Sequence, residues 1–190
     1  MRLTAPQHMT SDVSPLRAAL QRITDPPLNS GLERLETQIK EIANLKTRYP
    51  HDIWLHTKFT CAMRELNCFM YALGMSADHV REKCDAGVFP GAKFVKWLVD
   101  SNVLLPAFSE VKTDTNLVIY FGQADCPTHA GWIQGVRVTS KWGSGCTHIW
   151  THGIFEVPSG YGDCIGVFRL PVEGQAANAF SFWADGAIQS

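Results

Sequence analysis

The chain has 190 residues, of which 45% are hydrophobic and 18% charged, and its formal net charge is −1. This composition is typical of a globular protein with a substantial core and excludes extensive disorder. The near balance of acidic and basic residues lacks the basic footprint of a nucleic-acid-binding protein. No run of 18 or more apolar residues is present, so we expect no membrane span.

The N-terminal residues and the cysteines together indicate the compartment. The first 15 residues contain no apolar signal segment, which predicts a cytoplasmic protein, and signal-independent export stays compatible with them. Six cysteines could form a disulfide framework, but nothing points to an oxidising compartment, so we expect free thiols. A metal site built from Cys146 and His148 with His129 and His152 is disfavoured, because these spacings match no known zinc finger. The prediction is a protein without metal or other cofactor.

Helices are expected mainly in the first half of the chain. Pro26 and Pro27 end a first helix, and Asn29 and Ser30 can cap the second, which stops before Pro50. The expected helices are 14–23, a second one carrying the stripe Leu32, Leu35, Ile39, Ile42 and Leu45, a third from Asn67 to Gly74, and two more at 77–84 and 92–101.

Strands are expected from Asn116 onward, where short β-branched and aromatic runs alternate with turn residues. Gln134 and Gly135 predict a tight hairpin turn between the second and third of them. The expected strands are 117–121, 129–133, 136–141, 154–157 and 165–170. Lys141, in the sequence SKWGSG, is expected to be exposed at a turn. The tail after Gly174 receives no assignment.

Cys68 has the features of a thiol nucleophile. The thiolate is the reactive form, so a catalytic cysteine needs a lowered pKa, which helix N-terminal amides and a nearby imidazolium provide. Asn67 can cap the helix and place Cys68 in its first turn, and the apolar residues that follow would bury this helix. The alternative is a structural role, because buried free cysteines are common.

His129 is the candidate base. It opens a predicted strand directly after a loop, so its ring can face a cleft while the following residues alternate into the core. Ala130 and Gly131 are small enough to let a helix or a substrate approach closely. The alternative is a structural histidine at a strand end. A helical cysteine followed by a histidine on a later strand favours a cysteine hydrolase.

The segments NCFMYALG, NLVIYFG and THAGWIQGVRVTSKWG carry a more specific signal. Their content and order resemble the NlpC-type and CHAP-type papain-fold peptidases and amidases over about residues 66–170. The resemblance implies an α+β fold, with a Cys-bearing helix on the antiparallel sheet of a papain-like core at 61–190. The residue pattern before this core predicts a helical N-terminal segment at 1–60, and a helical insertion at about 76–109 is a departure from the family. The chain departs from the family where Asn67 precedes and Phe69 follows the cysteine, in place of the usual Asp and Ser.

The family has a third polar residue that orients the imidazole, on the strand after the histidine strand. Ser140 falls at this position when residues are counted through the hairpin turn, although His, Asn, Gln or Glu is more frequent there. His152 takes the place if the hairpin is longer, and His148 is a weaker candidate. The catalytic set implied by the resemblance is therefore Cys68, His129 and Ser140.

The expected activity is acyl transfer to sulfur. Cys68 would attack an amide carbonyl with His129 as general base, and backbone amides near Cys68 would stabilise the oxyanion. By resemblance, the substrates are peptidoglycan peptides, the context is a bacterial effector or wall remodelling, and an immunity or inhibitor protein is a candidate partner. Two rival functions stay open: an acyltransferase or deamidase with the same catalytic pair, and a non-catalytic binding module in which Cys68 only packs.

Overall fold

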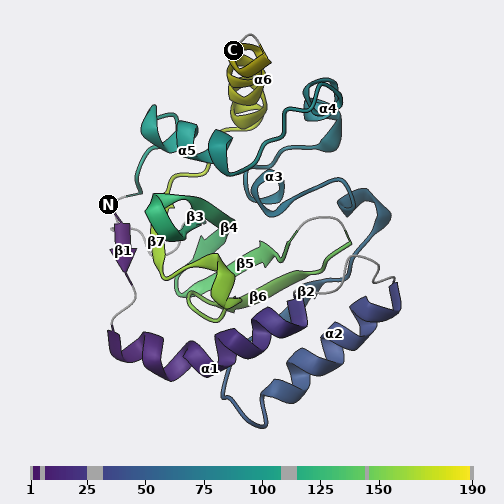
Figure 1. Cartoon of the computed structure of the whole chain (residues 1–190), viewed down its shortest axis with the longest axis vertical. Helices are drawn as coiled ribbons and strands as arrows, with labels where there is room; N and C mark the ends of the chain where they lie inside the picture. The colour runs from purple at the N-terminus through teal and green to yellow at the C-terminus, as the bar shows by residue number, and fades with distance from the viewer. Residues whose placement is uncertain (1, 5–6, 25–31, 108–114, 144–145, 189–190) are drawn as a thin grey trace.

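The structure is a computed structural model, which describes residues 2–4, 7–24, 32–107, 115–143 and 146–188. Side chains are described for these residues except 2–4, 7–12 and 32–34. Helices and an antiparallel sheet combine in it (Figure 1), which confirms the expected α+β class. Within the described residues, no helix is both long and apolar enough to cross a bilayer.

Seven strands form one antiparallel sheet in the described part of the chain, in the order β1-β7-β3-β4-β5-β6-β2. They are β1 (Arg2–Thr4), β2 (Trp54–Thr57), β3 (Asn116–Phe121), β4 (Pro127–Gln134), β5 (Arg137–Lys141), β6 (Ile149–Gly153) and β7 (Cys164–Phe168). β4 and β5 form the expected hairpin, with Gly135 at a φ of +60° in its turn. Glycine adopts a positive φ at low cost, so the turn forms where the sequence predicts it.

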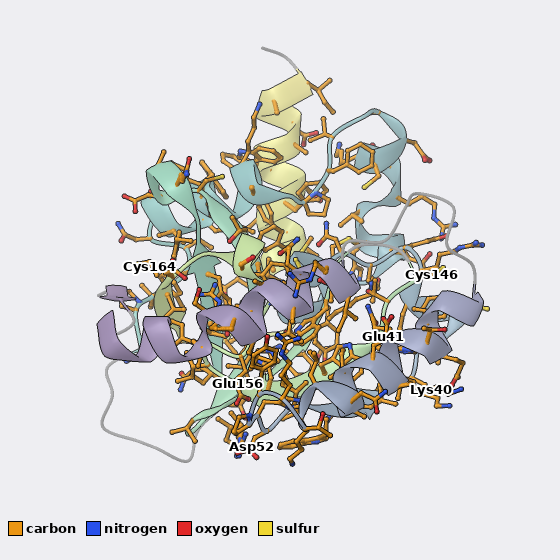
Figure 2. The ribbon with its side chains drawn as sticks, turned by 60° about the horizontal axis from the view of Figure 1, so that its bottom comes forward. Lys40, Glu41, Asp52, Cys146, Glu156 and Cys164 are labelled. Carbon is orange, nitrogen blue, oxygen red and sulfur yellow. The ribbon has the colours of Figure 1, made fainter. Side chains whose placement is uncertain are left out.

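Four of the five expected strands are present, as β3, β4, β5 and β7. The fifth, expected at 154–157, is wrong, because the chain turns there and the strand lies earlier, at β6. The Glu156 carboxylate accepts the N–H of Gly153 at 2.8 Å and that of Asp52 at 3.1 Å. Figure 2 shows Glu156 and Asp52 close to each other. These hydrogen bonds hold the turn that ends β6.

The helices are α1 (Gln7–Thr24), α2 (Leu32–Leu45), α3 (Cys68–Ala72), α4 (Ala77–Asp85), α5 (Ala92–Asp100) and α6 (Gln175–Ile188), with short 3-10 turns η1 (Cys61–Met63), η2 (Gln123–Asp125) and η3 (Ser159–Tyr161). The five expected helices correspond to α1 to α5, and α6 is the tail without an assignment. α4 and α5 lie between α3 and β3, where the helical insertion was expected. The expected cap of α2, Asn29 and Ser30, lies outside the described residues.

Helices cover both faces of the sheet (Figure 1). On the first face, Ile119 of β3 packs in one apolar cluster with Phe94 of α5 and Phe180 of α6, and α3 belongs to the same cluster. On the second face, Trp150 of β6 packs with Leu20 of α1, and Figure 2 shows α1 and α2 crossing the sheet on this side. Each face of β4 therefore meets a different set of helices.

The first 60 residues contribute strands as well as helices. Leu3 of β1 pairs with Ile165 of β7, and Leu55 of β2 pairs with Trp150 of β6. No sequence pattern predicted these two short strands. Through these two strands, the N-terminal segment 1–60, which was expected to be helical, joins the sheet of the expected core, 61–190.

Candidate active site

Cys68 is the first residue of α3, as expected. The side chain of Asn67 accepts a hydrogen bond from the Met70 N–H at 2.8 Å, which is the predicted N-cap. The same side chain donates to the Pro90 carbonyl at 3.2 Å, so the start of α3 is tied to the segment before α5. Gly74, at a φ of +66°, follows the helix end. The Asn67 side chain thus binds both the first turn of α3 and the segment before α5, which fixes the N-terminus of the helix.

The environment of the Cys68 thiol differs from the expectation of a lowered pKa. The residue is 8% exposed, and burial raises the pKa of its thiol to about 11. The backbone N–H of Ala130 and the Lys141 ammonium act in the opposite direction without offsetting this burial. The sulfur is therefore a protonated thiol at neutral pH.

His129 lies on β4 and is fully buried. Its ring stacks on that of Tyr161, with 3.8 Å between centroids, and lies 5.5 Å from the ring of Tyr120. Neither ring nitrogen has a hydrogen-bond partner among the described residues. A buried polar group left unpaired typically costs about 1–3 kcal/mol. Burial, and then the charge of His152, hold the pKa of His129 well below its ordinary value, so the ring is neutral.

The alternation of β4 sets the direction of the His129 ring. Ala130 belongs to the cluster beneath α3, whereas Ile133 packs with Tyr120 and Val138 on the opposite face. Because His129 and Ile133 are an even number of residues apart, the imidazole points to the face covered by α1 and η3. The predicted base thus lies on the far side of β4 from the body of α3.

The Cys68 sulfur reaches the strand itself. It faces the backbone N–H of Ala130, the residue that directly follows His129. Burial, and then the charges of Cys68 and Tyr120, raise the pKa of Tyr161 well above its ordinary value, so the phenol on His129 also lies within electrostatic reach of the sulfur. Cys68, His129 and Tyr161 therefore form one buried cluster around β4.

Ser140 and His152, the two candidates for the orienting residue, bind each other. They lie on β5 and β6, and both are fully buried. The Nδ1–H of His152 donates to the Gly153 carbonyl at 2.8 Å, so its Nε2 accepts the hydroxyl hydrogen of Ser140 at 2.9 Å. Burial lowers the pKa of His152 to about 4. Neither residue hydrogen-bonds the His129 ring in this arrangement.

His148, the weaker candidate, has a structural environment. Its Nδ1 accepts the N–H of Phe59 at 2.9 Å, and its Nε2–H donates to the carbonyl of Leu35 in α2 at 3.1 Å. Both ring nitrogens are thus occupied by the backbone. These bonds tie the start of β6 to α2 and to the segment after β2.

Lys141 also lies near the Cys68 thiol, a position that no sequence pattern predicted. The expected exposed lysine is fully buried at the end of β5, where its Nζ donates to the Thr147 hydroxyl at 2.6 Å. Burial lowers the pKa of Lys141 to about 8, and the nearby Cys68 and Cys146 raise it in part. Strand alternation places the side chain of Lys141 on the same face of β5 as Thr139 and on the opposite face from Ser140. The sequence does not indicate which of these two faces is covered.

A groove of about 700 Å³ opens beside the start of α3. Asn67 and Met70 line it, but Cys68 does not. Arg64 and Glu65 before α3 and Arg81 on α4 bring charges of both signs to it, and other lining residues, among them Leu66, Val80, Phe89 and Pro90, are apolar. The groove therefore runs along the start of α3 without the candidate nucleophile in its lining.

The six cysteines are free thiols in the structure. Among the described residues, no three His, Cys, Asp or Glu side chains are grouped so as to hold a metal ion. The chain matches no protein-family model, and no curated protein or solved structure is significantly similar to it.

Proposed function

We propose that the protein is a cysteine hydrolase that cleaves an amide bond by acyl transfer to Cys68, with His129 as general base. The supporting observation is that Cys68 packs in one buried cluster with Ala130, the residue next to His129, whose backbone N–H lowers the pKa of the thiol. A thiol hydrolase needs its nucleophile within reach of the imidazole, and Cys68 starts a capped helix that is seated against the strand carrying His129. The placement of α3 on an antiparallel sheet supports a papain-like core of the NlpC type.

The reaction begins when His129 takes the Cys68 proton and the sulfur attacks the amide carbonyl carbon. The backbone N–H groups of Cys68, Phe69 and Ala130 face the sulfur and would stabilise the oxyanion. The imidazolium then protonates the leaving amine as the C–N bond breaks. Water, deprotonated by His129, attacks the resulting thioester, and the carboxylic acid leaves as the thiol forms again.

The substrate class that we assign is a short peptide, with peptidoglycan stem peptides as the first to test. The groove beside α3 supports a peptide because it joins an apolar lining to charges of both signs, Arg64 and Arg81 with Glu65 and Asp85. Such a site can bind the carboxylates and the amine of one ligand together. Asn67 and Met70, on either side of the nucleophile in the sequence, line this groove.

A second function, the non-catalytic binding module, is favoured by a different observation. Cys68 is 8% exposed, and burial raises the pKa of its thiol to about 11, as for a packing residue. The two functions differ in whether the chemistry requires the sulfur atom. An acyltransferase or deamidase would require it as well, and would differ from a hydrolase only in its products.

The test compares Cys68→Ala with Cys84→Ala, since Cys84 is a thiol that lines the groove beside α3, whereas Cys68 does not line it. Release of new amines from stem peptides is followed by mass spectrometry. We expect Cys68→Ala and His129→Ala to lose about a thousandfold or more of the rate, and Cys84→Ala to retain it. Wild-type activity in Cys68→Ala would refute the proposal. Transfer of the acyl group to an added amine, or release of ammonia from glutamine side chains, would instead identify the acyltransferase or the deamidase.

A further inference from the structure

Residues 157–163, here called the Tyr161 loop, lie over the candidate base. The Tyr161 ring stacks on that of His129, with 3.8 Å between centroids and 14° between planes. The Tyr161 carbonyl accepts a hydrogen bond from the Thr128 hydroxyl at 2.6 Å, which anchors the loop beside the start of β4. The loop therefore occupies the space directly over the imidazole.

Helix α1 holds this loop at several points. The Arg17 guanidinium donates to the carbonyls of Val157 at 3.3 Å and Gly162 at 2.7 Å, and it forms an ion pair with Asp163. The Gln21 side chain accepts the Gly160 N–H at 2.8 Å. Arg17 is only 4% exposed and its bond to the Val157 carbonyl is buried, whereas Asp163 and the Gln21–Gly160 hydrogen bond lie at the surface. The two ends and the middle of the loop are thus bound to one helix face.

The Tyr161 loop covers the face of a base that has no hydrogen-bond partner among the described residues. Both His129 nitrogens are buried and unpaired among the described residues, although the ring lies next to the strand residue that the Cys68 sulfur faces. A general base must reach the proton it takes and must be open to the substrate. The closed arrangement meets neither condition. Gly160 and Gly162, on either side of Tyr161, are residues at which a loop can bend.

The geometry points to an autoinhibitory lid: the Tyr161 loop, latched by Arg17 and Gln21 of α1, closes the Cys68–His129 site, and its release opens the site to substrate. This inference rests on the proposed function for what the open site does. The latch belongs to the N-terminal segment, so displacement of α1 from the loop is the step that activates the protein. The lid itself is tested without any substrate.

The experiment measures the alkylation rate of each cysteine with iodoacetamide, resolved by mass spectrometry, in the full chain. Arg17→Met, Gln21→Ala and Tyr161→Ala remove the latch or the stacked ring. Arg22→Met, which changes an exposed arginine of the same helix, is the matched control. We expect Cys68 to react about tenfold faster or more in Arg17→Met and Tyr161→Ala, and faster to a smaller extent in Gln21→Ala. The exposed Cys61 and Cys126 should keep their rates in every variant, and Arg22→Met should match the wild type.

Two outcomes overturn the lid. The first is a wild-type Cys68 rate in Tyr161→Ala and Gln21→Ala while amide hydrogen exchange shows that residues 157–163 have been released. The second is an equal rise at Cys68 and the groove thiol Cys84, which would mean general unfolding. If Arg17→Met does not fold, the other two variants decide.

Peptide hydrolysis by the same proteins separates the two proposals. Faster alkylation without hydrolysis in any variant supports the lid and refutes the hydrolase. Hydrolysis by the wild type at the rate of the variants, with no change in alkylation, supports the hydrolase and refutes the lid. Hydrolysis that rises with alkylation supports both.

Discussion

The buried His152 makes the stability of the fold depend on pH in a way that can be calculated. Its ring is fully buried between β5 and β6, and burial lowers its pKa from 6.5 to about 4. Between these two values the unfolded chain binds a proton at this residue and the folded chain does not. Stability therefore falls as the pH drops from 6.5 toward 4, and the contribution is fully present above 6.5.

The expected size of this effect follows from the same interval. At 1.36 kcal/mol per pKa unit, the fall from 6.5 to about 4 corresponds to roughly 3 kcal/mol of unfolding free energy. The perturbation is His152→Asn, which keeps a donor for the Gly153 carbonyl and removes the titrating ring. The variant will have its own stability at pH 7, because packing and the bond to Ser140 change. Only the change of the unfolding free energy with pH tests the role of the His152 ring.

The assay is urea unfolding followed by tryptophan fluorescence at several pH values between 4 and 7.5. The wild type should lose about 3 kcal/mol more than His152→Asn over this range. The pKa of His129 is also lowered, so some acid sensitivity remains in the variant. Equal slopes in the two proteins would show that His152 is charged or solvated in the folded state, and the reasoning would be wrong.

Two further substitutions test the packing of β4 and β5. Gly131→Ala should destabilise the protein by about 3 kcal/mol or more, because its Cβ would lie 2.8 Å from the Thr139 carbonyl oxygen on the paired strand. Gly186→Ala, whose Cβ meets open space in α6, is the control in the same thermal unfolding assay and should not destabilise. The Lys141→Met variant should be more stable than the wild type, and the difference in their unfolding free energies should be largest below pH 8. Since the folded pKa of Lys141 is lowered from 10.5 to about 8, this advantage should shrink by roughly 3 kcal/mol between pH 8 and 10.5, as measured by urea unfolding. A constant difference between the two proteins would contradict a charged lysine inside the fold.

Local signals predicted the start of α3 and the β4–β5 hairpin. An asparagine before an apolar run and a glycine at a positive φ act on their immediate neighbours, so no knowledge of the rest of the fold was needed. The position of β6 was missed for the opposite reason. Thr151 and His152 are polar residues buried by partners on β5, and such pairing depends on residues distant in the sequence.

The same limit applies to the site. The sequence suggested Cys68 and His129, and the structure places the sulfur against the backbone next to His129. It could not predict that α1 and the Tyr161 loop cover the imidazole, or that Lys141 is buried. Both depend on which face of a strand receives a helix, and strand alternation alone leaves the two faces equivalent.

The outer strands of the sheet have a consequence for how the protein is made. β1 and β2 precede the other strands of the described chain, yet their hydrogen-bonding partners, β7 and β6, are the last two strands to be synthesised. Cotranslational folding can therefore complete the central strands before the borders, while the early segments wait without partners. Once they dock, the backbone edges of β6 and β7 are paired, and the borders of the sheet are the short strands β1 and β2, which offer little backbone for edge-to-edge aggregation.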